Sequence, residues 1–288
     1  MPRKLVEEQL VHFLREDIGQ GDSTTTAIIP TDITVTAKVI AKETGIAAGI
    51  KEAAILAQLM GLKVKVNIID GEEIKNRQVL MHITGDAQTI LTVERTLLNL
   101  LSRMCGIATA TYKLVKKLEV VESQAKIAAT RKTAPGLSYF DKRAISIGGG
   151  DTHRLHLDDM VLIKDNHIAL IGTPVDAVKL AKKNMSFSKK VEVEITDVKD
   201  LLQVARAGAD IIMLDNFTPE EAYKAAEALK NAKLSHNILL EVSGGINDET
   251  LIEYAKAKVD IISIGSLTHS TKALDISLEI TKKQTPPQ

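Results

Sequence analysis

The second half of this 288-residue chain carries the feature that most limits its fold, a regular alternation of apolar runs and helical stretches. Runs typical of buried β-strands lie at 125–129, 161–164, 191–194, 211–214, 238–242 and 260–264. Stretches typical of helices fill the gaps at 138–146, 174–184, 197–206, 219–230 and 248–257, with Asp197, Thr218-Pro219 and Asp248 as expected helix starts. Strands that are apolar throughout and separated by helices predict a parallel sheet buried on both faces.

Two α/β architectures fit this alternation, a barrel and an open doubly wound sheet. The six predicted strands are two fewer than a standard eight-stranded barrel contains. No Gly-x-Gly-x-x-Gly follows the first strand, which argues against a dinucleotide site in an open sheet. We place a barrel-like closure ahead of the open sheet, although the pattern alone leaves both available.

The first 120 residues have a different, mixed order that predicts an α+β domain. Alternating runs at 34–42, 63–69 and 78–84 indicate half-buried strands, and 51–60 and 91–118 indicate helices. Cys105 lies on the apolar stripe of the long helix and is expected to be inert core. We predict an N-terminal α+β domain over 1–107, an α/β barrel domain over 108–273 and a C-terminal tail over 274–288.

Composition excludes several classes of function. The 37 Lys and Arg residues balance 37 Asp and Glu residues, so neither nucleic acid nor an anionic membrane is an expected partner. Four Phe, four Tyr and no Trp leave no aromatic platform for stacking single-stranded nucleic acid. No apolar run approaches the roughly 18 residues that span a bilayer, and Met1–Gln9 has no secretory core. A single cysteine suits a reducing compartment, so a cytoplasmic location is expected.

Polar side chains gather at the carboxyl ends of the predicted strands. In a parallel α/β domain these ends share one face, and active sites are built on that face. The polar segments that follow the strands are, in chain order, Thr130–Thr133, Lys164–His167, Glu194, Asp215-Asn216, Ser243–Gly245 and Gly265-Ser266, with His269 shortly after. One shared site is the simplest interpretation.

The last two strands run into glycine-bearing loops, Ser243–Gly245 and Gly265-Ser266. In βα barrels such loops often bind phosphate through backbone N–H groups, and we prefer this interpretation to that of plain strand-to-helix turns. Gly148–Gly150 is a weaker signal, and we assign it no ligand.

Glu194 and Asp215 end two apolar strands, where burial of a carboxylate is costly unless a cation meets it. Magnesium held by one or two carboxylates together with substrate phosphates fits this requirement. Tetrahedral zinc does not, because Cys105 is alone and the histidines lack ligand spacing. Glu192 points to the same face, but Glu194 lies nearer the strand end and is the preferred residue.

Cationic side chains add donors to the same face, namely Arg131, Lys132, His153, Arg154 and Lys164. Lys164 ends the apolar run Val161–Ile163, so we expect its stem to be buried. It is then either a Schiff-base nucleophile or an anion ligand that keeps its charge, with a salt bridge to a neighbouring Asp as the structural alternative. Arg95, taken alone, is expected to be a solvated helix residue.

The chain resembles the quinolinate phosphoribosyltransferases in the strings EDIGQGDSTT, VERTLLNLLSRMCGIAT, TRKTAPGL, GGGDTHRLHLDDMVLIKDNH, VEVE, MLDNF, EVSGGI and IGSLTHS. The resemblance covers nearly the whole chain in order and is most specific at Thr130–Pro135 and His153–His167. Two departures, Ala134 where a second Thr is frequent and Leu155-His156 after the His-Arg pair, touch no expected ligand.

This resemblance implies a subunit with an N-terminal α+β sandwich-like domain and an incomplete, TIM-like α/β barrel of six strands. It also implies a homodimer, sometimes assembled further, in which an arginine of one subunit enters the active site of the other. The residue that matches this arginine is Arg95. The implied reaction joins quinolinate to 5-phosphoribosyl 1-pyrophosphate with loss of carbon dioxide, giving nicotinate mononucleotide and pyrophosphate for NAD biosynthesis.

The resemblance also implies roles for the site residues. The two carboxylates of quinolinate are expected to meet Arg131, His153, Arg154, Lys164 and the neighbouring Arg95. The phosphoribosyl donor is expected to meet Lys132, Lys164 and His269, with its 5-phosphate on Ser243, Gly244, Gly245 and Gly265. Glu194 and Asp215 are expected to hold the ribose hydroxyls or the Mg²⁺ ion, and Lys132, Lys164, Glu194 and Asp215 are the expected catalytic residues.

Three rival functions stay open. A nicotinate phosphoribosyltransferase would use a monocarboxylate without decarboxylation, although the density of cations favours a dicarboxylate. A barrel aldolase would use Lys164 as a Schiff-base lysine. A phosphosugar-binding protein would bind the donor without turnover.

Overall fold

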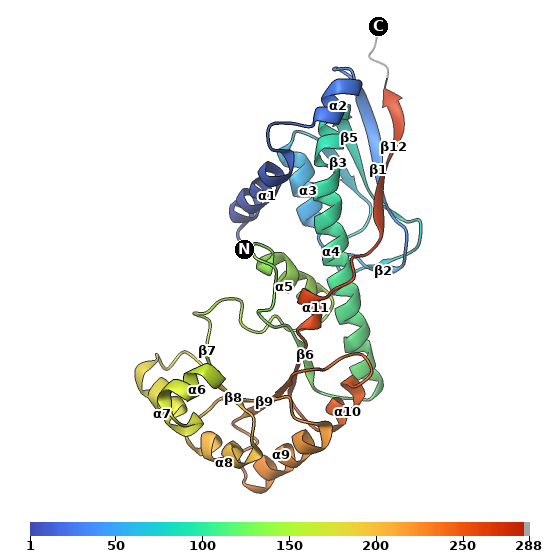
Figure 1. Ribbon diagram of the computed structural model, residues 1–288. Helices are drawn as coiled ribbons and strands as arrows, with labels where there is room; N and C mark the ends of the chain where they lie inside the picture. Colours follow the sequence, from blue (N-terminus) through green and yellow to red (C-terminus); the bar gives the residue numbers. More distant parts are fainter. Residues whose placement is uncertain (285–288) are drawn as a thin grey trace. The chain divides into compact units, whose positions relative to one another are not determined.

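The computed structural model describes residues 1–284 and divides them into two compact units that are interleaved along the chain. The first unit contains residues 1–110, 134–148 and the segment from 271 onward, and the second contains 111–133 and 149–270 (Figure 1). The predicted tail therefore begins within the first unit, and residues 285–288 of it lie outside the described part of the chain.

The first unit is built on an antiparallel sheet with the strand order β12-β1-β5-β3. Its strands are β1 (Thr34–Ala41), β3 (Lys63–Val66), β5 (Val79–Asp86) and β12 (Ile276–Gln284). Strict alternation of buried and half-buried residues along β1 shows why this sequence forms a strand with one face toward a core. Strand β12 comes from the segment that we expected to be a tail, and it pairs with β1.

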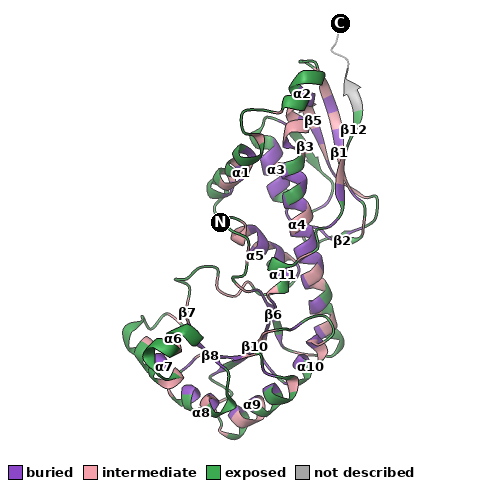
Figure 2. Cartoon of the chain, in the orientation of Figure 1, coloured by how far each residue is buried: buried purple, intermediate pink, exposed green. Residues whose placement is uncertain are grey.

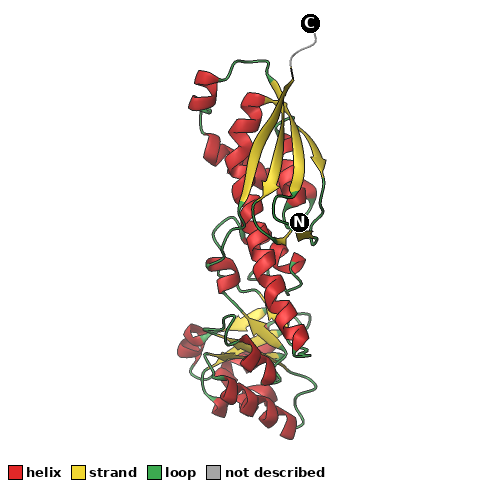
Figure 3. Ribbon diagram, turned by 90° about the vertical axis from the view of Figure 1, so that its right-hand side faces the viewer, coloured by secondary structure: helices red, strands yellow, loops and turns green. Residues whose placement is uncertain are grey.

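The helices of the first unit are α1 (Arg3–Ile18), α2 (Ser23–Ile28), α3 (Ile50–Leu59) and α5 (Ser138–Ile147), with most of α4 (Ala87–Val120). Figure 3 shows the antiparallel sheet with helices packed against one of its faces. A two-residue pair, β2 (Gly45–Ile46) and β4 (Glu73–Ile74), completes the unit. Cys105 of α4 is fully buried, and burial raises the pKa of its thiol to about 12, so this thiol is unreactive core as expected.

Helix α5 corrects one expectation, because we placed 138–146 among the helices that cover the parallel sheet. It packs instead within the first unit. Asp141, fully buried, accepts two hydrogen bonds from the Arg103 guanidinium of α4 at 2.7 and 2.8 Å. Phe140 stacks against Phe13 of α1, with ring centroids 5.5 Å apart. These partners, which the strand–helix spacing does not reveal, give the helix its place.

The second unit contains six parallel strands in the order β6-β11-β10-β9-β8-β7. They are β6 (Lys126–Ala128), β7 (Val161–Ile163), β8 (Val191–Ile195), β9 (Ile211–Asp215), β10 (Leu239–Ser243) and β11 (Ile261–Ser263). Strands β7 to β11 lie side by side in the order in which they occur in the sequence, and β6 pairs with β11, as in a barrel. In a doubly wound sheet the strand order would reverse in the middle. Within residues 1–284 no ladder joins β6 to β7, so the barrel is incomplete.

The helices of this unit are α6 (Asp165–Ile171), α7 (Pro174–Asn184), α8 (Val198–Arg206), α9 (Pro219–Asn231), α10 (Leu251–Lys256) and α11 (Ser266–His269). Asp197 and Thr218 cap α8 and α9 as expected, each accepting a hydrogen bond from a backbone N–H of the first turn. The expected start at Asp248 is wrong, because Asn247 binds the backbone N–H groups of Glu249 and Thr250 in a turn, and α10 begins at Leu251.

Side chains of the strands alternate between the helix side and the interior of the barrel. Figure 2 shows these strands as largely buried. The interior series includes four polar residues that are about nine-tenths buried or more, Glu192, Glu194, Glu241 and Ser263. Charged groups inside such a barrel are costly, which marks them as functional candidates. Among the described residues, no helix has both the length and the apolar character needed to cross a membrane.

Candidate functional site

A cavity of about 570 Å³ lies at the carboxyl ends of the six strands, entirely within the second unit. Its wall contains most of the residues that the sequence singled out, namely Arg131, Lys132, His153, Arg154, Lys164, Glu194, Asp215, Ser243, Gly244 and Gly245. Gly265 and His269 are adjacent, because a Cβ on Gly265 would lie 3.2 Å from Lys132 Cδ and 3.3 Å from the His269 ring. One cavity therefore collects these residues from segments far apart in the sequence.

The cations of the cavity come from the edges of the sheet. Arg131 and Lys132 follow β6 and are exposed, and His153 and Arg154 lie in the segment whose Asp151 forms a bridge with Ala128 beside β6. Burial lowers the pKa of Arg154, and the nearby Arg131 lowers it further. Two guanidinium groups that repel each other beside a cavity are stabilised by an anion placed between them, and a planar carboxylate suits their geometry.

Lys164 follows β7, the other edge strand, and its side chain differs from our expectation. We expected a buried stem, but 46% of the side chain is exposed. Its Nζ donates a hydrogen bond to Glu194 Oε2 at 2.7 Å, so the partner is a glutamate of the adjacent strand β8 instead of a neighbouring aspartate. The short β7 ends at Ile163 and leaves Lys164 beyond the last ladder pair, which explains the exposure.

Glu194 and Asp215 come from the interior strands β8 and β9. Glu194 is 9% exposed and pairs with Lys164, so a cation does meet this carboxylate. Burial raises the pKa of Asp215, the charge of Glu194 raises it further, and Lys164 and Lys132 oppose this rise. Asn216 Nδ2 donates to Asp215 Oδ2 at 2.9 Å and orients the carboxylate. The two acids therefore interact across the cavity.

The residues fit a magnesium ion at this pair. Repulsion between Glu194 and Asp215 is the type of strain that a divalent cation relieves, and Asp215 is half-buried at the cavity wall, where water and phosphate oxygens can complete the shell. A second possible cluster, His153 with Glu192 and Glu241, lies deeper in the barrel. There the two carboxylates raise the pKa of His153, which favours an imidazolium that donates a hydrogen bond to Glu241.

The loop after β10 has a conformation that requires glycine. Gly244 has φ 100°, and a Cβ there would lie 2.1 Å from Asn216 Oδ1. Gly245 also has a positive φ, 62°, but faces open space. Thr268 of α11 donates to the Lys132 carbonyl at 2.8 Å, which links the loop after β11 to the loop after β6. Bare backbone at this mouth is the arrangement that binds phosphate oxygens.

His153 is the part of the site that sequence reasoning understood least. Its side chain is 10% exposed and its Nε2 lies 3.1 Å from Glu241 Oε2 and 3.4 Å from Glu192 Oε2. Burial alone would lower the pKa of His153, but the two carboxylates outweigh it and raise the pKa to about 10. Glu241 in turn accepts a hydrogen bond from Ser263 Oγ at 2.6 Å. Burial also raises the pKa of Glu192.

Glu241 and Ser263 were missed. The available signal was a single glutamate inside the otherwise apolar run ILLEV, a position where an unpaired carboxylate would be costly.

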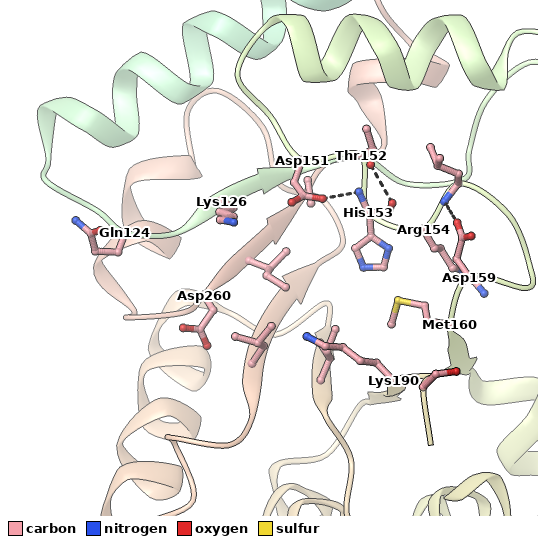
Figure 4. A pocket seen from close by; sticks show the side chains of 16 residues that line it. Gln124, Lys126, Asp151, Thr152, His153, Arg154, Asp159, Met160, Lys190 and Asp260 are labelled. Atoms are coloured by element: carbon pink, nitrogen blue, oxygen red, sulfur yellow. Dashed lines mark hydrogen bonds between the residues drawn. The ribbon is translucent and has the colours of Figure 1, made fainter. Parts of the chain in front are cut away.

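A second cavity of about 650 Å³ lies beside the amino ends of the strands (Figure 4), and His153 and Arg154 line both cavities. In that view the backbone N–H of His153 donates to Asp151, which anchors the residue at φ 51°.

Arg95 lies on α4 in the first unit and is exposed. Its placement as a solvated helix residue is what its spacing alone predicted. The role that the resemblance implies for it stays a prediction.

Comparisons with known proteins show the family to which this chain belongs. Residues 107–279 match the family described as "Quinolinate phosphoribosyl transferase, C-terminal domain", and residues 22–105 match the corresponding N-terminal domain. A probable carboxylating nicotinate-nucleotide pyrophosphorylase of Methanocaldococcus jannaschii is 47% identical over 94% of this chain and 95% of its own length. The carboxylating enzyme of Dictyostelium discoideum is 38% identical over 98% of both chains.

A solved structure gives the same result for the fold. The nicotinate-nucleotide pyrophosphorylase of Francisella tularensis superposes with a TM-score of 0.88 at 36% identity and covers 98% of both chains. The incomplete barrel with a separate α+β domain is therefore shared with solved relatives, which confirms the expected fold class.

Proposed function

Because the chain belongs to the quinolinate phosphoribosyltransferase family, we propose that it transfers the phosphoribosyl group of 5-phosphoribosyl 1-pyrophosphate to quinolinate with loss of carbon dioxide. The products are nicotinate mononucleotide and pyrophosphate, and the reaction belongs to NAD biosynthesis. One observation carries the assignment of the site, namely that a single cavity has cations from the edge strands and carboxylates with glycine loops from the interior strands.

The cationic part of the cavity binds quinolinate. Its two adjacent carboxylates need several donors at fixed positions, and Arg131 and Arg154 offer planar forks while His153 and Lys164 offer single charged donors. The mutual repulsion of the two arginines falls when a carboxylate lies between them. These contacts fix the orientation of the pyridine ring, so that its nitrogen points in one direction.

The remaining part of the cavity binds the phosphoribosyl donor. Backbone N–H groups of Ser243–Gly245 and Gly265 hold the 5-phosphate, and Lys132 and His269 contact the donor nearby. Glu194 and Asp215 hold the ribose hydroxyls or a Mg²⁺ ion. When bound, the ion neutralises charge on the pyrophosphate leaving group.

The chemistry needs placement and charge more than proton transfer. The pyridine nitrogen attacks C1 of the ribose as the bond to pyrophosphate breaks, and the lone pair of the nitrogen forms the new N-glycosidic bond. Glu194 and Asp215 face the positive charge that develops on the ribose. The C–C bond to the 2-carboxylate then breaks, carbon dioxide leaves, and the electron pair stays on the ring carbon, where the positive charge of the neighbouring quaternary nitrogen stabilises it until a proton bonds to that carbon. Lys132, Lys164, Glu194 and Asp215 are the residues that we place at the reacting atoms.

The rival functions are less well supported. Lys164 Nζ pairs with Glu194 at 2.7 Å, whereas a Schiff-base lysine needs its amine free to attack a carbonyl. A nicotinate phosphoribosyltransferase binds a single carboxylate, which needs fewer cations than the five that line this cavity when His153 is protonated.

The test is a steady-state assay of purified protein with the donor, Mg²⁺ and either quinolinate or nicotinate. We expect nucleotide formation from quinolinate, at least about 100-fold lower kcat/KM with nicotinate, and loss of activity with a chelator that Mg²⁺ reverses. Equal use of nicotinate would favour the rival transferase. Borohydride labelling of Lys164 with a carbonyl substrate would favour the aldolase, and donor binding without turnover would favour a binding protein.

We also propose that the active form is a cytoplasmic homodimer in which Arg95 enters the cavity of the partner subunit. Its support is the exposure of Arg95 on α4 and the position of Arg95 within residues 22–105, the segment that matches the N-terminal domain of the family. Mixing an Arg95→Ala variant with an Asp215→Asn variant tests it. Each variant alone is expected to be nearly inactive, and hybrid dimers should recover about a quarter of wild-type activity, because half the dimers then hold one intact site. A mixture without recovery would contradict a shared site.

A further inference from the structure

The barrel interior holds a hydrogen-bonded chain that runs from β11 to His153. Ser263 Oγ donates to Glu241 Oε1 at 2.6 Å, and Glu241 Oε2 lies 3.1 Å from His153 Nε2. Glu241 is fully buried and Ser263 is 3% exposed. Both oxygens of the Glu241 carboxylate are therefore occupied, one by the serine and one by the imidazole.

This series of hydrogen bonds determines which protons the His153 ring carries. A neutral imidazole carries one N–H, and pairing with a carboxylate places that proton on Nε2. The other ring nitrogen, Nδ1, has no partner among the described residues, and His153 lines the proposed substrate cavity. For Nδ1 to donate to a substrate carboxylate as well, the ring must carry both protons and a positive charge.

A buried carboxylate is an expensive means of stabilising a barrel. An apolar side chain of similar volume would fill the interior of β10 at no such cost, as Leu240 and Val242 do on its other face. A role in holding the charge and direction of His153 explains the presence of Glu241 and its serine.

We propose that Glu241, held by Ser263, is a positioning residue that keeps His153 as an oriented imidazolium. The site can then bind a dicarboxylate even in alkaline solution. This inference rests on the proposed function for its substrate. It assigns to Glu241 no contact with substrate.

Other charged and polar groups near the His153 ring also influence its charge. Glu192 of β8 lies 3.4 Å from Nε2, and Arg154 is the next residue in the chain. Lys126 of β6 and Asp159 line the second cavity that His153 also borders. Of the remaining strands, β7 and β11 present the uncharged Leu162 and Ser263 to the substrate cavity, and β9 presents Met213 and the carboxylate Asp215. Only Glu241 and Glu192 therefore approach Nε2 with opposite charge within the described chain.

The first test is an NMR titration of the histidine rings in wild type, Glu241→Gln and Ser263→Ala, with His153 assigned by its loss in His153→Asn. In wild type the pKa of His153 is about 10, so its ring stays protonated through pH 9. We expect Glu241→Gln to lower it by about two units and Ser263→Ala to lower it by less. An unchanged His153 titration in both variants would overturn the proposal. Where Glu241→Gln does not fold, the Ser263→Ala titration decides.

The second test is the pH dependence of the quinolinate KM. Wild type should change less than about twofold between pH 6.5 and 9, whereas Glu241→Gln should show about a tenfold rise as His153 loses its charge, with the KM of the donor unaffected. Tyr254→Phe is the matched control, because it removes another buried hydrogen bond of the same unit, 2.8 Å from Tyr254 Oη to the Phe217 carbonyl. The control should lose stability while its pH profile stays flat.

The two tests separate this inference from the proposed function. If wild type does not turn over quinolinate, the proposed function fails, and the NMR titration still decides whether Glu241 maintains the imidazolium. If quinolinate is the substrate but its KM in Glu241→Gln is flat with pH, the positioning role is wrong and the function stands.

Discussion

The two parts of the cavity are built on opposite principles. The cationic part takes Arg131, His153, Arg154 and Lys164 from the edge strands β6 and β7 and the segment beside β6. The donor part takes Glu194, Asp215 and the glycine loops from the interior strands β8 to β11. Edge positions leave long side chains room to adapt to a ligand, whereas interior strands fix short carboxylates and bare backbone by ladder pairs on both sides.

This difference shows which of the two substrates must be placed most precisely. Quinolinate carries two charged groups that several long donors can follow, so the edge strands suffice. The ribose carbon must meet the pyridine nitrogen at a defined distance and angle, and the rigid interior strands supply that alignment. The imidazolium of His153 is the exception on the cationic part, because interior residues hold it from behind.

The largest expected effect is a loss of activity caused by a substitution in the donor part of the cavity. Asp215→Asn keeps the shape of the side chain but removes the charge that faces the ribose, so kcat/KM for the donor should fall about 1000-fold, or ~4 kcal/mol. Quinolinate affinity, measured by calorimetry without the donor, should change less than about threefold. Equal losses for both substrates would break the division between the two parts.

The next effect is on the cationic part. Arg131→Ala removes one of the two guanidinium groups, so kcat/KM for quinolinate should fall about 100-fold, since a charge-assisted donor to a carboxylate is lost. The KM of the donor is the internal control and should stay within about threefold. Quinolinate affinity unchanged in single-turnover kinetics would contradict the assignment of Arg131.

A pair of glycine variants tests the rigidity of the donor part. Gly244→Ala forces a Cβ to within 2.1 Å of Asn216 Oδ1 at φ 100°, so the free energy of unfolding should fall by about 3 kcal/mol and the donor KM should rise. Gly245→Ala is the matched control, because its Cβ meets open space, and it should cost only about 1 kcal/mol. Urea denaturation of both variants measures the difference, and equal losses would show that the loop adapts.

The smallest expected effect concerns pH and stability. Pairing raises the pKa of His153 from 6.5 to about 10, so its contribution to folding is complete below about pH 6.5 and declines as pH rises through 10. Wild type should lose stability steadily over this window, and Glu241→Gln should lose less because it lacks the pairing. Unfolding curves at pH 6.5, 8 and 9.5 measure this. A steeper decline in Glu241→Gln would contradict the pairing.

Much of the second unit follows from sequence because its pattern is local. Each strand is a short apolar run, each helix has a periodic face, and the polar residues follow the strand ends, so α7 is predicted to the residue. The first unit depends on partners distant in sequence. Strand β12 forms because β1 offers it an edge more than 230 residues earlier, and α5 is placed by Arg103 and Phe13.

Within the site, strand ends predict which residues meet but not how far each is buried. The expectation of a buried Lys164 stem failed because β7 stops one residue before it. Glu241 was overlooked because its partners, His153 and Ser263, come from 88 and 22 residues away. A charged residue inside an apolar run is the signal that deserved weight, since the interior must compensate it.

The most direct test of the central claim uses quinolinate labelled with carbon-14 in either carboxylate, with the purified protein, the phosphoribosyl donor and Mg²⁺. The account predicts one labelled carbon dioxide for each nucleotide formed from the 2-carboxylate label, and full retention of the 3-carboxylate label in the nucleotide. Nucleotide that retains the 2-carboxylate label, or carbon dioxide released without the donor, would contradict the claim that glycosidic bond formation drives decarboxylation in this cavity.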